Sequence, residues 1–150
     1  MVSHEIIEEI SFVQDYMKEH NVYAAIFHNR KPIGSIKEND FGSFFNLIKD
    51  VDSDYFDSFI GINYLGKPEA LLCRYIHAKG VFIHKGTMKG IATLIVGNIP
   101  HQIEMLVKNE NENTDDQNEI LRKSVMYVDD PIKAYDIINE KILQMTLYSG

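Results

Sequence analysis

Along the first twenty residues, apolar side chains recur at intervals of three and four, which is the spacing of one helix face. Ser3 stands where a helix N-cap is expected, so the pattern predicts an amphipathic helix that ends near Asn21. Residues 22–27 then form a short apolar run rich in strand formers, and after a polar turn residues 32–36 are typical of the returning strand of a hairpin. The helical stripe consists of Ile6, Ile10, Val13 and Met17.

A stripe rich in aromatic residues follows Asp40, which is itself a typical helix cap. Its rhythm predicts a long helix that extends to residue 59. Two alternatives stay open, because residues 52–54 can divide this helix and residues 59–64 can instead form a strand. The stripe comprises Phe41, Phe44, Phe45, Ile48, Val51, Tyr55, Phe56 and Phe59.

The region after residue 69 predicts three antiparallel strands joined by two tight hairpins. The strands are expected at residues 70–77, 81–85 and 91–96, and the turns between them end at Gly80 and Gly90. The first of these strands is apolar on most of both faces, which indicates a position within the sheet or at a subunit contact.

The last third of the chain is read as mostly helical. Pro100 is expected to begin one helix, and Asp130 with Pro131 to begin another. We therefore predict an α+β fold, with a mostly antiparallel five-stranded sheet and helices packed on it. It divides into a domain at residues 1–108, an acidic loop at 109–119 and a C-terminal extension with a helix at 120–150.

Composition fits one compact domain, because 45% of the 150 residues are hydrophobic and 25% are charged. The net charge of −7 argues against a nucleic-acid binder, whose domain is normally basic. The single Cys73 has no internal disulfide partner, and the sequence shows no signal peptide, no lipidation motif and no apolar run of about 18 residues. We expect a cytoplasmic protein that does not bind membranes.

Positive charge is concentrated in one part of the chain. Residues 70–103 carry four bases and no acid, so a total of −7 leaves −11 for the rest. Such a block can attract a phosphate, a nucleotide or an acidic protein surface, although lysines in turns are also common as solvated residues that discourage edge pairing. The candidate anion- or partner-binding residues are Arg74, His84, Lys85 and Lys89.

No residue pattern predicts catalysis or a metal centre. The histidines show no known ligand spacing, and Cys73 has no second Cys with which to bind zinc. A Cys in the middle of a strand usually behaves as a small apolar residue. We expect no catalytic residue, no metal and no cofactor.

The aromatic stripe indicates homodimerisation, although most of it also suits an ordinary core. A helix that is apolar beyond one narrow face needs a cover, and a second copy across a two-fold axis supplies one. The residues expected at this interface are Phe44, Phe45, Ile48, Phe56, Phe59, Leu71 and Cys73.

Three segments resemble the roadblock family, also called the dynein light chain roadblock family, whose small domains accompany Ras-like GTPases in bacteria and archaea. The order of the predicted elements is similar, and the resemblance covers about residues 4–108. It implies an obligate homodimer joined through the long helices and third strands, which binds a small GTPase or anchors a larger assembly and has no catalytic residues. The segments are residues 22–35, 65–72 and 90–96.

Two alternatives belong to other classes of protein. Residues 65–68, 81–86 and 123–126 resemble the flavin-binding split-barrel family, in which the basic block would hold the phosphate of FMN. A profilin-like or sensor-type module that binds a small anion on the same strands is the other alternative.

Overall fold

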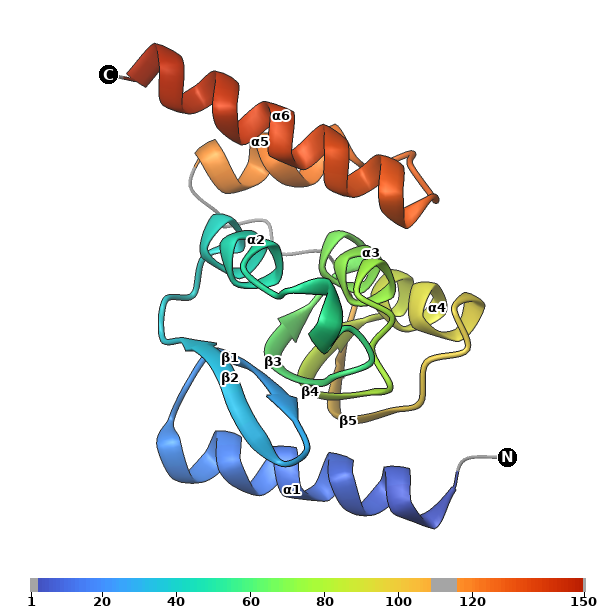
Figure 1. Cartoon of the computed structure of the whole chain (residues 1–150). Helices are drawn as coiled ribbons and strands as arrows, with labels where there is room; N and C mark the ends of the chain where they lie inside the picture. Colours follow the sequence, from blue (N-terminus) through green and yellow to red (C-terminus); the bar gives the residue numbers. More distant parts are fainter. Residues whose placement is uncertain (1–2, 109–115, 150) are drawn as a thin grey trace.

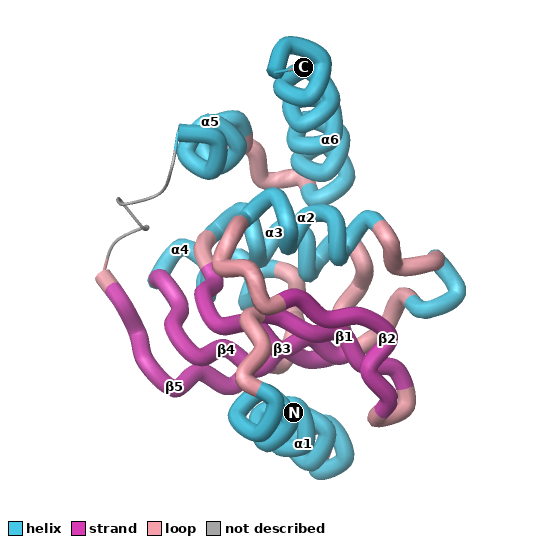
Figure 2. The backbone as a smooth tube through the Cα atoms, turned by 90° about the vertical axis from the view of Figure 1, so that its left-hand side faces the viewer, coloured by secondary structure: helices cyan, strands magenta, loops and turns pink. Residues whose placement is uncertain are grey.

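The computed structural model describes residues 3–108 and 116–149 and shows a five-stranded sheet with helices on both faces. The strand order is β2-β1-β3-β4-β5. Helix α1 covers one face of the sheet, and α2, α3 and α4 cover the other (Figures 1 and 2). Helices α5 and α6 form a further layer outside α2 and α3.

The described part of the chain contains six α-helices and five strands. The helices are α1 (His4–His20), α2 (Phe41–Lys49), α3 (Lys67–Tyr75), α4 (Met88–Val96), α5 (Asp116–Ser124) and α6 (Pro131–Ser149), with a short 3-10 turn at Ser53–Tyr55. The strands are β1 (Ala24–His28), β2 (Lys31–Ile36), β3 (Phe59–Leu65), β4 (Gly80–Thr87) and β5 (His101–Val107).

The first three predicted elements are present. Ser3 caps α1 by accepting a hydrogen bond from the backbone N–H of Ile6 at 3.2 Å, and Asn21 ends the helix in a left-handed conformation. The buried face of α1 lies close to the sheet at Gly61, where an added Cβ would come within 2.7 Å of Val13. The glycine therefore sets how closely this helix packs on β3.

The sheet is mixed, which corrects the prediction of a mostly antiparallel one. Strand β1 pairs antiparallel with β2 and β3, whereas β3, β4 and β5 run parallel to one another. Parallel neighbours need a crossover, and α3 and α4 supply the two crossovers. The predicted strands at residues 70–77 and 91–96 are these two helices, and the helix predicted from Pro100 is strand β5.

The aromatic stripe forms a core within one chain. Helix α2 ends at Lys49, and Phe59 already belongs to β3, so the alternative that placed a strand at 59–64 is the correct one. Phe41, Phe44 and Phe45 are buried between the sheet and the outer helices. Most of the stripe is therefore covered by the chain itself, whereas Tyr55 keeps 44% of its surface exposed.

The C-terminal extension packs on the domain that precedes it. Helix α6 starts at Pro131, as predicted, and its Ala134 and Ile138 are fully buried in the main core. The expected acidic loop at 109–119 lies in part outside the described residues, and α5 begins at Asp116. Among the described helices none has the length and apolarity that crossing a membrane requires.

Candidate functional site at the carboxyl edge of the sheet

The carboxyl ends of the parallel strands are where ligands usually bind in open α/β sheets. Here β3 ends at Leu65 and continues directly into α3, and β4 ends at Thr87 and continues into α4. Glu69, in the first turn of α3, is buried at this edge with a side-chain exposure of 1%. A buried carboxylate at a ligand-binding edge makes this region the first place to look for function.

Glu69 forms an ion pair with Arg122, which reaches the site from α5. One guanidinium nitrogen of Arg122 donates to Glu69 Oε1 at 3.0 Å, and the other donates to Oε2. Glu69 Oε1 also accepts the backbone N–H of Gly66 at 3.0 Å, which completes the cap of α3. Two parallel bonds to one carboxylate fix the orientation of both side chains.

Aromatic rings enclose the guanidinium on two sides. Its central carbon lies 5.2 Å from the ring centroid of Phe41 and 5.2 Å from that of Tyr64. Burial by itself lowers the pKa of Arg122, but the charge and hydrogen bonds of Glu69 outweigh this effect and raise it. Arg122 therefore stays charged, although its buried Nε has no hydrogen-bond partner among the described residues.

Neighbouring groups share this electrostatic environment. Burial, followed by the charge of Glu69, raises the pKa of the Tyr23 hydroxyl, so Tyr23 stays protonated at neutral pH. On the same face of α5, the side chain of Asn118 accepts the backbone N–H of Phe41 at 3.0 Å, at the start of α2. Helix α5 thus covers the N-terminal ends of both α2 and α3 with its own polar side chains.

Glu69 and Arg122 bind each other at the edge of the sheet where a ligand would otherwise bind. Glu69 and Arg122 neutralise each other's charge. Within residues 3–108 and 116–149, no group of His, Cys, Asp and Glu side chains is placed to hold a metal ion. Burial raises the pKa of the Cys73 thiol, so this Cys is a poor nucleophile. The ion pair connects α5 to the first turn of α3.

The predicted basic residues do not form one site. His84 lies on the α1 side of β4, where its Nδ1 is 3.0 Å from Glu104 Oε1, whereas Lys85 follows it on the opposite face and is exposed. Arg74 lies on α3, where its guanidinium donates to the backbone oxygen of Asp129 at 3.4 Å. Lys89 is exposed in the first turn of α4.

The residues expected at a dimer interface are mostly inside the protomer. Phe44, Phe45, Ile48, Leu71 and Cys73 are all buried in the core of a single chain, and the surface of a folded protomer does not present them. Phe59 packs against α1, and Phe56 is half-buried against the main core.

The sequence did not predict the pairing of Glu69 with Arg122, because 53 residues separate them and neither residue was expected to contribute to a site. A local signal was present at one of them. Pro68 followed by Glu69 matches the first turn of a helix with a capping box, and not the start of a strand. No comparable signal marks Arg122, which is one of several charged residues on an amphipathic helix.

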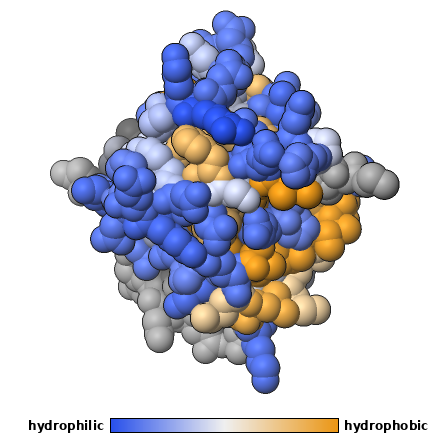
Figure 3. Space-filling view, turned by 90° about the horizontal axis from the view of Figure 1, so that it is seen from below, coloured by the Kyte–Doolittle hydropathy of each residue, from blue (hydrophilic) through white to orange (hydrophobic). Residues whose placement is uncertain are grey.

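A second feature is an exposed apolar surface over α4 and β5. Orange residues gather on this side of the molecule in Figure 3. Among the described residues, strand β5 has a neighbour on one side only, so its other edge is open there. We refer to this region as the α4/β5 surface, and its exposed side chains are Met88, Ile95, Val96, Met105 and Leu106.

Comparisons with known proteins identify the fold. No family model matches the sequence, and no curated protein matches it significantly. The crystal structure of a DUF1893 family protein, TM1506 from Thermotoga maritima, superposes with a TM-score of 0.73 at 12% sequence identity, covering 94% of this chain and 92% of that chain.

This match corrects the assignment to the roadblock family. Two of the three segments that carried the resemblance, at residues 65–72 and 90–96, contain most of helices α3 and α4 and not the expected strands. The hairpins expected on either side of residues 81–86, on which the flavin-binding alternative rested, are absent because the flanking segments form helices α3 and α4. The chain has the fold of the DUF1893 family protein TM1506, and at this level of identity the likeness concerns the fold alone.

Proposed function

We propose that this chain is a non-enzymatic regulatory or scaffolding protein that acts as a homodimer, and that the two copies meet through the α4/β5 surface. The observation that carries the proposal is the combination of an open strand edge with five exposed apolar side chains beside it. Exposed apolar side chains that gather on one side of a domain often mark an interaction site.

The carboxyl edge of the sheet supports the non-enzymatic part of the proposal. A substrate entering there would have to displace Arg122 from Glu69, which leaves a buried carboxylate without its counter-charge. Burial also raises the pKa of the Cys73 thiol on α3, which makes this Cys a poor nucleophile. The prediction of a GTPase partner rested on the roadblock resemblance and is not carried further.

A second copy suits the edge of β5 better than an unrelated strand. When two β5 strands pair antiparallel about Met105, Ile103 of one copy lies opposite Val107 of the other, which continues one apolar row across the two-fold axis. The same register places Glu104 opposite Leu106 and not opposite a second Glu104. The pairing would extend the sheet through both copies.

Light scattering on a size-exclusion column tests this arrangement. The natural chain is expected at twice its mass of 17.3 kDa, and the double variant Ile95→Asp with Met105→Asp at one times that mass. Both residues are more than 45% exposed, at 59% and 49%, so the substitutions disturb the interface and not the core.

Leu143→Asp is the matched control, because Leu143 is 52% exposed on α6, a helix that packs on α3 and α5. This variant is expected to remain a dimer. A natural chain that elutes as a monomer would refute the dimer. A double variant that stays dimeric would refute the interface while leaving the dimer intact.

A further inference from the structure

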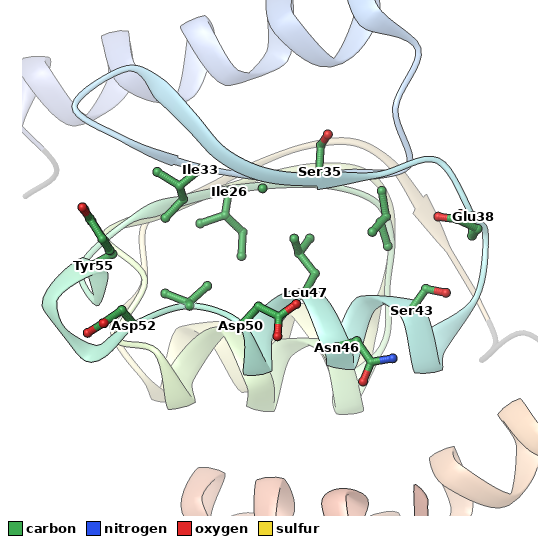
Figure 4. A pocket seen from close by; sticks show the side chains of 13 residues that line it. Ile26, Ile33, Ser35, Glu38, Ser43, Asn46, Leu47, Asp50, Asp52 and Tyr55 are labelled. Carbon is green, nitrogen blue, oxygen red and sulfur yellow. The ribbon is translucent and has the colours of Figure 1, made fainter. Parts of the chain in front are cut away.

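A groove lies between strand β2 and helix α2, on the side of the sheet opposite to β5. It has a volume of about 480 Å³ and opens to solvent along the hairpin. Ile26 and Ile33 reach into it from the hairpin and Leu47 faces them from α2, as Figure 4 shows. Ile33 and Tyr55 keep 39% and 44% of their surface exposed, so the apolar lining is accessible.

The rim of the groove is acidic. Glu38 stands at one end, and Asp50 and Asp52 stand along α2 and at the other end (Figure 4). All three are exposed, and none has an ion-pair partner in the part of the chain that the structure describes. The residues that line the groove include no Lys, Arg or His. The potential at this rim is therefore negative and favours a cation.

The backbone beside the groove is also available for binding. Within the part of the chain that the structure describes, strand β2 pairs only with β1, so its outer edge is open along the side of the groove. Pro32 has no N–H to donate, which leaves Ile33 to Ile36 as the part of the edge that can pair with an added strand. An extended peptide binds such an edge through its main chain and places alternate side chains into a neighbouring pocket.

We propose that the β2/α2 groove is a docking site for an extended basic peptide segment of a partner protein, with an apolar side chain in the groove and Lys or Arg side chains at Glu38, Asp50 and Asp52. The apolar lining selects the anchor, the acidic rim selects the flanking charges, and the free edge of β2 selects an extended backbone. This site is separate from the α4/β5 surface, so it does not depend on the proposed dimer.

Fluorescence anisotropy with defined probes tests the docking site. The probe is a fluorescein-labelled peptide of alternating Lys and Leu, about seven residues long, the length of an ordinary strand. The triple variant E38Q/D50N/D52N is expected to weaken its binding by about tenfold, since it removes three exposed charge pairs. Asn at position 52 keeps the cap that Asp52 gives to the backbone N–H of Asp54.

The matched control is D15N/E19Q/E140Q, which changes the net charge equally at exposed positions outside the groove. It is expected to keep the affinity of the natural chain within about twofold, the scatter that screening of distant charges allows. Ile33→Ser tests the apolar part and is expected to weaken binding with little change in the unfolding midpoint, because Ile33 is 39% exposed.

Several results would overturn the proposal. Equal losses in the two triple variants would mean that the probe responds only to the net charge of −7. A peptide of alternating Lys and Ser that binds as tightly would exclude the apolar anchor, and a peptide of Glu and Leu that binds as tightly would exclude the acidic rim. Backbone amide shifts that change at β5 and not at β2 would place the probe elsewhere.

Discussion

Replacing Arg122 by Ala is expected to destabilise the fold far more than the loss of one surface charge would. Arg122 is the counter-charge of Glu69, whose side chain is 1% exposed. Among the described residues, only the backbone N–H of Gly66 still donates to that carboxylate in the variant. Removing one partner of a buried pair leaves an uncompensated charge, which costs about 3–5 kcal/mol. A domain of this size has a total stability of about 5–15 kcal/mol, so the loss is a large fraction of it. Urea denaturation followed by circular dichroism measures this loss of stability.

Two further variants isolate the pair. Replacing both residues, Glu69→Gln with Arg122→Met, is expected to cost less than Arg122→Ala alone, because no buried charge is left. Lys123→Ala is the control on the same helix, since its ion pair with Glu119 is exposed and contributes less than about 1 kcal/mol. An Arg122→Ala cost as small as that of Lys123→Ala would refute the reasoning.

The remaining predictions concern the C-terminal helix and one surface carboxylate. Ile138 is fully buried, so Ile138→Ala is expected to lower the free energy of unfolding by about 2–5 kcal/mol, whereas Leu143→Ala, at a 52% exposed position, should change it much less. Equal effects in urea denaturation would mean that α6 is not part of the core. Hydrogen bonds from His84 and then Lys18 lower the pKa of Glu104, so its contribution to stability is present above the unfolded pKa and lost as pH falls through the folded value. Glu104→Gln should remove that part of the acid dependence, and an unchanged pH profile of stability would count against the interaction.

The polar residues expected at the ends of helices and in turns predicted the positions of the neighbouring elements correctly. Ser3, Asp40 and Asp130 each precede a helix in the structure, and the hairpin of β1 and β2 lies where its turn residues predict it. Each cap depends on a single local hydrogen bond, which contacts with distant residues seldom disrupt.

The apolar segments were assigned less well, because a fully buried run has no polar face to reveal its period. Residues 70–73 are buried on all sides, and they form a helix where a strand was expected. Ile91, Ile95 and Val96 prefer strands as isolated residues, but the cap from Thr87 and the packing of α4 on α3 make them helical. The error in strand order, and with it the family assignment, followed from these two segments.

The site depends on contacts that no local pattern contains. The approach of α5 to α3 follows from the path of the whole chain, so the pairing of Glu69 with Arg122 could not be read from either segment. The acidic groove likewise combines Glu38, after β2, with Asp50 and Asp52, after α2, and each is an ordinary surface residue on its own.

The 53 residues between Glu69 and Arg122 also have a consequence for synthesis of the chain. At translation rates of about 5–20 residues per second, the ribosome adds Arg122 roughly 3 to 10 seconds after Glu69. During that interval β4 and β5 are synthesised and complete the sheet, but Arg122 is not yet present to neutralise the carboxylate. Closure of the domain around Glu69 is therefore a late event, which awaits the arrival of α5.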